Sequence, residues 1–290
     1  MMTVADVTRH SVAALVQAGF PPTDAHRDVA VLARHLLQWD TAAWLTRQRD
    51  LAPAELGAPL DALVSRRALG EPVAYLCGAR EFYGREFSVT RDVLIPRPDT
   101  ELLCERVLSL LAARPAASPS PVIVDVGTGS GCIAVTLAAE VPGLLVIASD
   151  TSPAALEIAA ANATRHRVAD RIRFVEGSLT AGTTDVDVVV SNPPYIPEGD
   201  RAGLMRDVRD FEPASALFAG EDGLDVIRAL IPEARRALRA GGVLALEIGS
   251  GQADAVAALM AEAGFSAIRA TRDLAGIPRT VEGVRLPASV

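Results

Sequence analysis

The chain has 290 residues, and since a typical domain has roughly 100–200 residues this length predicts two domains. Half of the residues are hydrophobic and 22% are charged, which excludes a disordered chain, and no apolar run reaches the ~18 residues that a membrane-spanning helix needs. The formal net charge of −8 argues against a protein whose main task is binding nucleic acid, because such domains usually carry a basic face.

Residues 1–70 are predicted to form a small helical domain. Pro22, Thr23 and Asp24 give the signal for the start of a helix, and apolar residues then recur at helical spacing. These apolar residues are Ala25, Val29, Leu32, Leu36 and Trp39. A further helix is predicted over residues 53–68, and glycine is sparse throughout this region.

Residues 71–98 are predicted to form a hairpin that links the helical domain to the rest of the chain. Residues 86–90 alternate polar and apolar side chains, as a half-buried strand does, and Gly84 suits the turn before them. Pro96 and Pro98 then end any regular element.

Residues 99–290 are predicted to form an α/β domain. A helix over residues 100–113 and a loop rich in proline, alanine and serine, ending at Pro121, precede a series of continuous apolar runs, which are typical of strands buried on both faces. The runs cover residues 122–126, 144–148, 172–175, 186–190 and 243–248. Helical segments over residues 153–167, 223–240 and 252–264 separate most of them. This alternation predicts a mainly parallel, doubly wound sheet.

The last two strand candidates, residues 266–271 and 280–286, are joined by a short loop without a helix. A loop of this length permits only antiparallel pairing, since a parallel connection needs a crossover of roughly a dozen or more residues. The sheet is therefore predicted to finish with an antiparallel hairpin at one edge.

A glycine-rich turn after the first of these strands marks a candidate cofactor site. In Gly127-Thr128-Gly129-Ser130-Gly131 the glycines let a ligand approach the backbone, and the following helix N-terminus supplies amide donors. The second strand ends at Asp150, about twenty residues further on, where a carboxylate can accept both hydroxyls of a ribose. These features predict an adenosine-containing cofactor, either a nicotinamide dinucleotide or S-adenosylmethionine.

The spacing of the glycines favours S-adenosylmethionine. The dinucleotide fingerprint places Gly or Ala at the sixth position of G-x-G-x-x-G, and here that position is Cys132. A turn that binds a diphosphate is therefore disfavoured, whereas G-x-G-x-G suits a ligand without phosphates. A nicotinamide-dependent oxidoreductase and a cofactor-binding module without activity are the alternatives from other classes.

Ser191-Asn192-Pro193-Pro194-Tyr195 directly follows the fourth strand and marks a candidate acceptor site. Ligands of open α/β sheets bind at the carboxyl ends of the strands, so this loop is expected to face the glycine-rich turn. The side-chain oxygen of Asn192 and the backbone oxygen of Pro193 can each accept one N–H of a planar NH₂ group, which orients its lone pair toward an incoming methyl group. Tyr195 offers a flat face for a planar amide or base.

Three further motifs resemble the signature of the HemK/PrmC family. They are Glu71-Pro72-Val73-Ala74-Tyr75-Leu76-Cys77-Gly78, Glu81-Phe82-Tyr83-Gly84 and Leu94-Ile95-Pro96-Arg97-Pro98-Asp99-Thr100-Glu101. The resemblance extends over nearly the whole chain, up to Asp273-Leu274-Ala275-Gly276. Asn-Pro-Pro-Tyr is shared with enzymes that methylate adenine or guanine amino groups, so this motif does not by itself identify the family. The segment from Ile95 to Glu101 and the helical domain are what make the chain similar to HemK/PrmC in particular.

The resemblance implies a fold and a reaction. The fold is a Rossmann-like class I methyltransferase sheet of seven strands in the order 3-2-1-4-5-7-6, over residues 99–290, preceded by the helical domain for substrate recognition. The reaction transfers a methyl group from S-adenosylmethionine to the side-chain nitrogen (N5) of the glutamine in the Gly-Gly-Gln motif of peptide chain release factors.

The resemblance also implies the site residues. Asn192, Pro193 and Tyr195 are the catalytic candidates, and with Pro194 they form the substrate contacts. The candidate cofactor contacts are Gly127, Thr128, Gly129, Ser130, Gly131, Asp150, Leu179 and Asn192. One departure stands at Ser178, where relatives often carry an acidic residue, so the adenine contacts are left open. Arg97, Asp99 and Glu101 line the cofactor mouth or form a structural ion-pair network, and the sequence favours neither.

The acceptor is left open among related enzymes. A sister branch methylates a glutamine of a ribosomal protein, and a nucleic-acid amino group is the less favoured alternative. Methylation of a base in a DNA duplex needs a basic surface, and the helical domain, which carries seven acidic and seven arginine side chains, has no excess of basic residues to form one.

Neither a metal site nor a disulfide framework is expected. His10, His26, His35 and His166 show no ligand spacing with Cys, Asp or Glu. Cys77, Cys104 and Cys132 are an odd number without a CxxC pair, and the start of the chain lacks the apolar segment of a secretory signal. We therefore expect the protein in the reducing cytoplasm.

Overall fold

The computed structural model describes residues 2–114 and 120–287. The chain forms two compact units, one of Met1–Ala79 with Met205–Phe211 and the other of Arg80–Leu204 with Glu212–Val290. Among the described residues no helix is both long and apolar enough to cross a membrane. The assignment of functional domains to residues 1–70, 71–98 and 99–290 stays a prediction.

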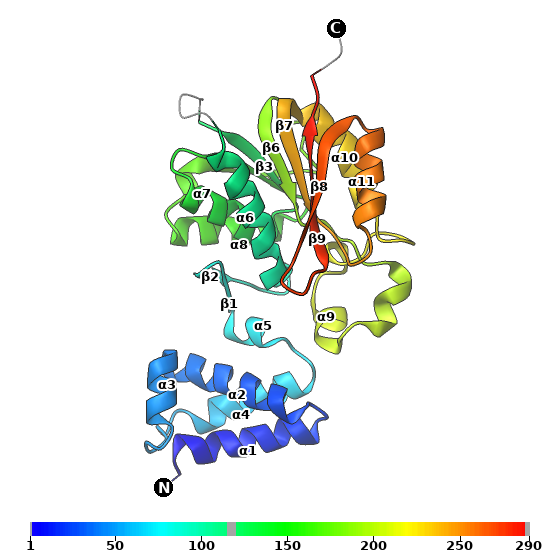
Figure 1. The fold of residues 1–290 in the computed structure, drawn as a ribbon. Helices are drawn as coiled ribbons and strands as arrows, with labels where there is room; N and C mark the ends of the chain where they lie inside the picture. The colour runs from blue at the N-terminus through cyan, green and yellow to red at the C-terminus, as the bar shows by residue number, and fades with distance from the viewer. Residues whose placement is uncertain (1, 115–119, 288–290) are drawn as a thin grey trace. The chain divides into compact units, whose positions relative to one another are not determined.

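The first unit consists of helices, as predicted for this part of the chain (Figure 1). They are α1 (Val4–Gln17), α2 (Pro22–Leu37), α3 (Thr41–Arg47), α4 (Gly57–Ala68), α5 (Val73–Cys77) and α9 (Arg206–Phe211). Its core contains the fully buried Val4, Leu15, Leu32, Leu56 and Leu60. The side chain of Thr3 caps α1 and forms a capping box with Asp6.

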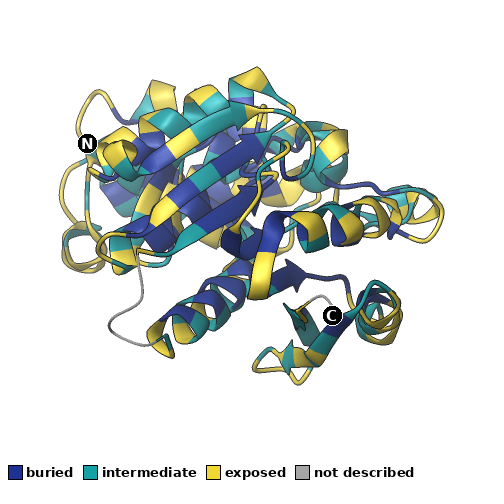
Figure 2. Ribbon diagram, turned by 90° about the horizontal axis from the view of Figure 1, so that it is seen from above, coloured by how far each residue is buried: buried dark blue, intermediate teal, exposed yellow. Residues whose placement is uncertain are grey.

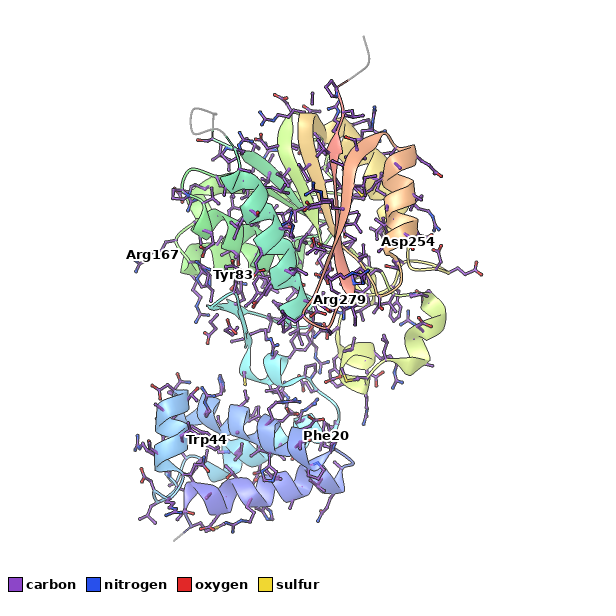
Figure 3. All side chains as sticks on the ribbon, in the orientation of Figure 1. Phe20, Trp44, Tyr83, Arg167, Asp254 and Arg279 are labelled. Carbon is purple, nitrogen blue, oxygen red and sulfur yellow. The ribbon has the colours of Figure 1, made fainter. Side chains whose placement is uncertain are left out.

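A buried ion pair cross-links these helices. The guanidinium of Arg67 in α4 contacts Asp28 in α2 at 2.7 Å and Asp207 in α9 at 3.5 Å. It also lies 4.5 Å from the ring centroid of Phe20, which Figure 3 labels. The side chains of Arg67 and Asp28 are 8% and 6% exposed, so the pair is shielded from solvent and from screening by salt.

The second unit is built around a seven-stranded sheet with the strand order β5-β4-β3-β6-β7-β9-β8. The strands are β3 (Val122–Val126), β4 (Leu145–Asp150), β5 (Ile172–Glu176), β6 (Val186–Ser191), β7 (Leu238–Glu247), β8 (Phe265–Arg272) and β9 (Pro278–Arg285). The first five are parallel, whereas β9 runs antiparallel to both β7 and β8. This order and the closing hairpin confirm the predicted topology.

Helices cover both faces of the sheet (Figure 1). On one face lie α6 (Pro98–Ala112), α7 (Cys132–Glu140) and α8 (Pro153–Arg165), and on the other lie α10 (Asp225–Ala237) and α11 (Ala253–Glu262). Each face has its own apolar cluster, and every residue of β6 at the centre of the sheet is buried. Figure 2 shows buried residues in dark blue along the strands between the helices. A continuous apolar run is what such two-sided burial requires.

The predicted hairpin is present as β1 (Ala79–Phe82) and β2 (Arg85–Ser88), with Gly84 in its turn. Helix α5 before it was not predicted. The predicted helix over residues 223–240 ends at Ala237, because β7 begins at Leu238 and continues through a register shift opposite β6. The loop predicted before Pro121 lies largely outside the described residues.

Candidate active site

The glycine-rich turn leaves β3 and begins α7. Gly127, Gly129 and Gly131 all have positive φ angles, of 70°, 55° and 78°. A Cβ on Gly131 would lie 3.0 Å from the Cβ of Ala159 in α8, so a side chain does not fit there. The backbone N–H of Gly127 donates to the carbonyl oxygen of Ser149 at 2.9 Å, which ties the turn to the end of β4.

Asp150, the last residue of β4, is held by two backbone donors. Its Oδ2 accepts from the N–H of Gly129 at 2.9 Å, and its Oδ1 accepts from the N–H of Ser152 at 2.9 Å. Ser152 itself caps α8 through its side chain. The carboxylate is therefore fixed beside the glycine-rich turn, as the sequence spacing predicts, and each of its oxygens has a second lone pair for another donor.

A second carboxylate, Asp125, lies beneath the turn and is fully buried. Its Oδ2 accepts from the hydroxyl of Thr128 at 2.6 Å and from the backbone N–H of Ala134 at 3.2 Å. Burial raises the pKa of Asp125 from 3.8 to about 7, and these two donors only partly oppose that effect. The side chain is buried too deeply to line the cavity and acts as an internal brace for the turn.

The Asn-Pro-Pro-Tyr loop begins where β6 ends, next to the glycine-rich turn. The hydroxyl of Ser191 donates to the carbonyl oxygen of Val126 at 2.7 Å and so joins the ends of β6 and β3. The side chain of Asn192 donates from Nδ2 to Oγ1 of Thr100 at 3.1 Å. In this orientation Oδ1 of Asn192 accepts no hydrogen bond from the described residues, and it keeps its lone pairs for a ligand.

Tyr195, the last residue of the motif, is held by residues of other elements. Its hydroxyl donates to Oε1 of Glu247 at 3.3 Å, and its backbone oxygen accepts from Nε2 of Gln252 at 3.0 Å. Burial and the neighbouring Glu247 raise the pKa of Tyr195 above its ordinary value, so the phenol stays protonated at neutral pH.

These two loops line one cavity of about 410 Å³ at the carboxyl ends of the strands. Of the predicted site residues, the cavity brings together Gly127, Gly129, Asp150, Leu179, Asn192, Pro193 and Pro194. Thr128, Ser130, Gly131 and Tyr195 are not among its lining residues and support those that are. Other parts of the wall come from residues 92–94, from Pro213, Ser215 and Ala216, and from the first turns of α10.

Gly177, Ser178 and Leu179 form one side of the cavity. Leu179 has a φ of 53°, and its carbonyl oxygen accepts from the hydroxyl of Ser149 at 2.7 Å. The loop after β5 is thereby held at the end of β4, with an apolar side chain next to the polar group of Asp150. An apolar wall beside a carboxylate is what an adenosine needs, since its base is flat and its ribose carries two hydroxyls.

The charged residues of the Ile95 to Glu101 motif take part in structural contacts. Arg97 pairs with Glu212, and Glu212 also accepts from the backbone N–H of Ile95 at 3.1 Å. Oε1 of Glu101 accepts from the backbone N–H of Tyr83 at 2.8 Å. This supports a structural ion-pair network for the motif, and none of its three charged residues lines the cavity.

Arg279, labelled in Figure 3, extends this network to the closing hairpin. Its guanidinium contacts Asp99 at 3.2 Å and Asp273 at 2.9 Å. Asp273 in turn accepts from two backbone N–H groups of its own turn, those of Ala275 and Ile277. The motif 273–276 therefore fixes the turn between β8 and β9 and joins it to the start of α6.

Comparison with known proteins gives a consistent result along the whole chain. Residues 6–78 match the model of the PrmC N-terminal domain, and residues 104–206 match that of the methyltransferase small domain. A release factor glutamine methyltransferase of Cereibacter sphaeroides is 43% identical over 99% of this chain and 100% of its own. The protein of the same name from Nitratidesulfovibrio vulgaris is 47% identical over 76% of this chain and 74% of its own.

The chain belongs to the release factor glutamine methyltransferase family. Among solved structures, the hMettl16 catalytic domain in complex with MAT2A 3′UTR hairpin 6 superposes with a TM-score of 0.57 at 16% identity. That likeness covers 80% of this chain and 84% of the other, and it confirms the class I methyltransferase fold. The family and the fold make this chain a methyltransferase that uses S-adenosylmethionine.

The cavity fits that cofactor on its own geometry. At Gly127 and Gly129 the turn presents backbone without side chains to the cavity, and the described residues that line it include no arginine or histidine to neutralise a diphosphate. Asp150 offers carboxylate oxygens for hydroxyl groups, and Leu179 offers an apolar surface. Among the described residues there is also no cluster of side chains that would hold a metal ion.

Proposed function

We propose that this methyltransferase modifies the side-chain nitrogen of the glutamine in the Gly-Gly-Gln motif of peptide chain release factors. The observation that carries the proposal is the orientation of Asn192, whose Nδ2 is engaged by Thr100 while Oδ1 is left for a ligand beside Pro193. The names of relatives that cover nearly the whole chain support a release factor as the acceptor.

The glycine-rich turn, Asp150 and Leu179 would hold the cofactor. The backbone of Gly127 and Gly129 would allow close approach, Asp150 would accept from the ribose hydroxyls, and Leu179 would pack on the base. When bound, S-adenosylmethionine supplies an electrophilic methyl group. The turn and Asp150 are fixed to each other by hydrogen bonds, so the cofactor meets a preformed site.

The acceptor nitrogen is a poor nucleophile, because an amide spreads its lone pair into the neighbouring carbonyl. Oδ1 of Asn192 and the backbone oxygen of Pro193 each accept one of its N–H groups, which holds the nitrogen in place and stabilises the positive charge that develops on it. The rigid turn at Pro193 and Pro194 fixes the second acceptor. No general base is required before attack, since the alkylated nitrogen loses its proton readily.

Tyr195 supports this loop from behind. Its hydroxyl is held by Glu247 and its backbone oxygen by Gln252, so Tyr195 fixes the loop from outside the cavity. The helical domain over residues 1–70 would hold the remainder of the partner protein. Cys77, Cys104 and Cys132 are not joined in disulfides, which favours the cytoplasm, where thiols stay reduced, as the compartment of the reaction.

A competition experiment tests the acceptor. A release factor, total ribosomal protein and unmethylated DNA are incubated together with the enzyme and cofactor carrying a labelled methyl group. We expect the label on the Gly-Gly-Gln peptide of the release factor, found by mass spectrometry. A release factor with alanine in place of that glutamine is the matched control and should stay unlabelled.

Two outcomes would contradict the proposal. Label in a ribosomal protein with the release factor unmodified would reassign the chain to the sister branch. Label in the DNA alone would make the acceptor a base.

A further inference from the structure

Glu212 is a buried carboxylate directly before a part of the cavity wall, and the reaction scheme assigns it no part. It is the residue at which the chain re-enters the second unit after α9, and its side chain is 1% exposed. Removing a carboxylate from water is unfavourable unless hydrogen-bond donors stabilise it. The donors to Glu212 therefore show which parts of the molecule this residue holds together.

Both oxygens of Glu212 accept from the segment 92–97, which lies between β2 and α6. Oε2 accepts from the backbone N–H of Ile95 at 3.1 Å, and Oε1 accepts from the guanidinium of Arg97. The bond to Ile95 is buried, whereas the side chain of Arg97 is 33% exposed. Residues 92–94 of the same segment line the cavity. The carboxylate thus fixes the end of one part of the wall.

The chain directly after Glu212 forms a second part of the wall, the segment 212–219. Its residues Pro213, Ser215 and Ala216 line the cavity, and they lie in or next to a 3-10 helix of three residues. A helix this short does not hold its own position, so the contacts at the two ends of the segment determine where it lies. Glu212 provides the contact at the first end.

The second end of the segment 212–219 is attached to the chain just after the Asn-Pro-Pro-Tyr loop. The N–H of Ile196 donates to the carbonyl oxygen of Leu217 at 2.9 Å, and the carbonyl oxygen of Ile196 accepts from the N–H of Ala219 at 3.0 Å. Ile196 and Phe218 are thereby paired as a parallel bridge. The segment is therefore held at one end by Glu212 and at the other by the residue that follows the loop.

The order of the strands separates two sides of the cavity. Asp150 ends β4 and Leu179 follows β5, whereas Asn192 follows β6. In the strand order β5-β4-β3-β6, β6 lies on the other side of β3 from β4 and β5. The segment 212–219 is bonded to the chain that leaves β6, so it borders the half of the cavity that would receive the acceptor amide.

We propose that Glu212 is a positioning residue, which joins the segments 92–97 and 212–219 into the wall against which the acceptor binds. This inference rests on the proposed function, since it takes the half of the cavity beside Asn192 to receive glutamine. Glu212 is not among the residues that line the cavity, so it acts through the shape of the wall. The wall contacts parts of the acceptor that do not react, and it does so equally before and during methyl transfer. Interactions of that kind lower KM without raising kcat.

The substitution Glu212→Ala removes both hydrogen bonds and tests the role directly. With purified enzyme and a release factor, KM for the release factor should rise about tenfold, while kcat stays within threefold of the wild type. Cofactor affinity in calorimetry should also stay within threefold, because Asp150 and the glycine-rich turn are untouched. Asn192→Ala should instead lower kcat, since its amide acts on the reacting nitrogen. A mere loss of folded enzyme would lower the apparent kcat and leave KM unchanged.

Two milder variants decide the question if Glu212→Ala does not fold. Glu212→Gln keeps one acceptor oxygen at the same reach, but its NH₂ group cannot accept from the second donor. Arg97→Met removes the partly exposed partner and keeps the bond to Ile95. Each variant loses one of the two hydrogen bonds, so KM should rise about three- to tenfold with kcat retained.

The matched control is Glu282→Ala. Glu282 in β9 has the same relative exposure as Glu212, 6%, and it also pairs with an arginine, Arg106, at 2.8 Å. It is not among the residues that line the cavity. This variant should lose stability in thermal unfolding and keep KM, kcat and cofactor affinity, so a change in KM with Glu212→Ala would not follow from the loss of a buried ion pair alone.

The inference and the proposed function fail in different ways. A release factor that stays unlabelled with wild-type enzyme contradicts the proposed function. If the wild type labels the release factor and Glu212→Ala, or both milder variants where it does not fold, keep KM within threefold, the inference alone is wrong. Cofactor affinity that weakens more than threefold in Glu212→Ala also contradicts the inference, because the wall would then belong to the cofactor side.

Discussion

Replacement of Asn192 by alanine removes one acceptor for the substrate N–H and little else. In the structure this side chain makes a single hydrogen bond, from Nδ2 to Thr100 at 3.1 Å. Loss of that bond should lower the free energy of unfolding by about 0.5–1.5 kcal/mol. Loss of one preorganised group that stabilises transition-state charge lowers kcat by roughly 10²–10³-fold, equivalent to about 2.7–4 kcal/mol. The effect on rate should therefore exceed the effect on stability.

The assay for Asn192→Ala is single-turnover methylation of a release factor at saturating cofactor, with cofactor affinity measured by calorimetry. Affinity should stay within a few-fold of the wild type, because Asp150 and the glycine-rich turn are untouched. The chain's other asparagine gives a contrast. Asn162 donates to the carbonyl oxygens of Ser88 and Ser130 and accepts from the N–H of Ser88, so Asn162→Ala should lower stability by about 3 kcal/mol at ~1 kcal/mol per bond. Near-normal turnover in Asn192→Ala would refute the orienting role.

Three further results are expected. Asp150→Ala should weaken cofactor binding about 10–100-fold in calorimetry, because hydrogen bonds to a charged group contribute roughly 1.5–3 kcal/mol; an unchanged affinity would contradict its role. Arg67→Ala should lower the free energy of unfolding by about 3 kcal/mol in a denaturant titration, since it leaves the buried Asp28 with only its longer contact to the exposed Arg27 at 3.4 Å; a loss below ~1 kcal/mol would contradict the account of that cluster. The pKa of Asp125 is raised from 3.8 to about 7, so the folded chain holds this proton more tightly and loses stability as the pH rises between these values. The free energy of unfolding of Asp125→Asn should therefore rise relative to that of the wild type over this pH range, by up to ~1.4 kcal/mol per pH unit. If the difference between the two free energies does not change with pH, the raised pKa of Asp125 is contradicted.

The strands of the large sheet were predictable from the sequence, because their burial between two layers of helices leaves a pattern in the chain. β3 and β6 read as continuous apolar runs because helices cover both of their faces, and the short loop before β9 allows only a hairpin. Short elements held by distant partners were not predictable. Helix α9 has six residues, and the contact of Asp207 with Arg67, which comes from another region of the chain, has no local signal.

The same distinction separates the site residues that were predicted from those that were not. Gly127, Asp150 and Asn192 stand at strand ends in recognisable motifs, and all three line the cavity. Glu247 stands at a strand end too, but a single glutamate after an apolar run has no distinguishing pattern. Its contact with the active-site loop, the hydrogen bond from the hydroxyl of Tyr195 at 3.3 Å, joins residues that are far apart in sequence and has no local signal.

The polar geometry of the active-site loop specifies a planar NH₂ group and not a particular molecule. Two acceptor oxygens and a flat apolar surface suit the amide of glutamine and the amino group of a base equally well, because both have two N–H groups in one plane. The choice of acceptor must therefore depend on surfaces that contact the rest of the substrate. A nucleic acid has a charged phosphate backbone that requires a basic surface, whereas this chain has a net charge of −8 and its residues 1–70 carry as many acidic as arginine side chains. A polypeptide loop makes no such demand, since its backbone is uncharged and its glycines let it enter a narrow cavity. The net negative charge of the chain therefore favours a protein acceptor, whereas the active-site loop by itself would accept the amide of glutamine or the amino group of a base.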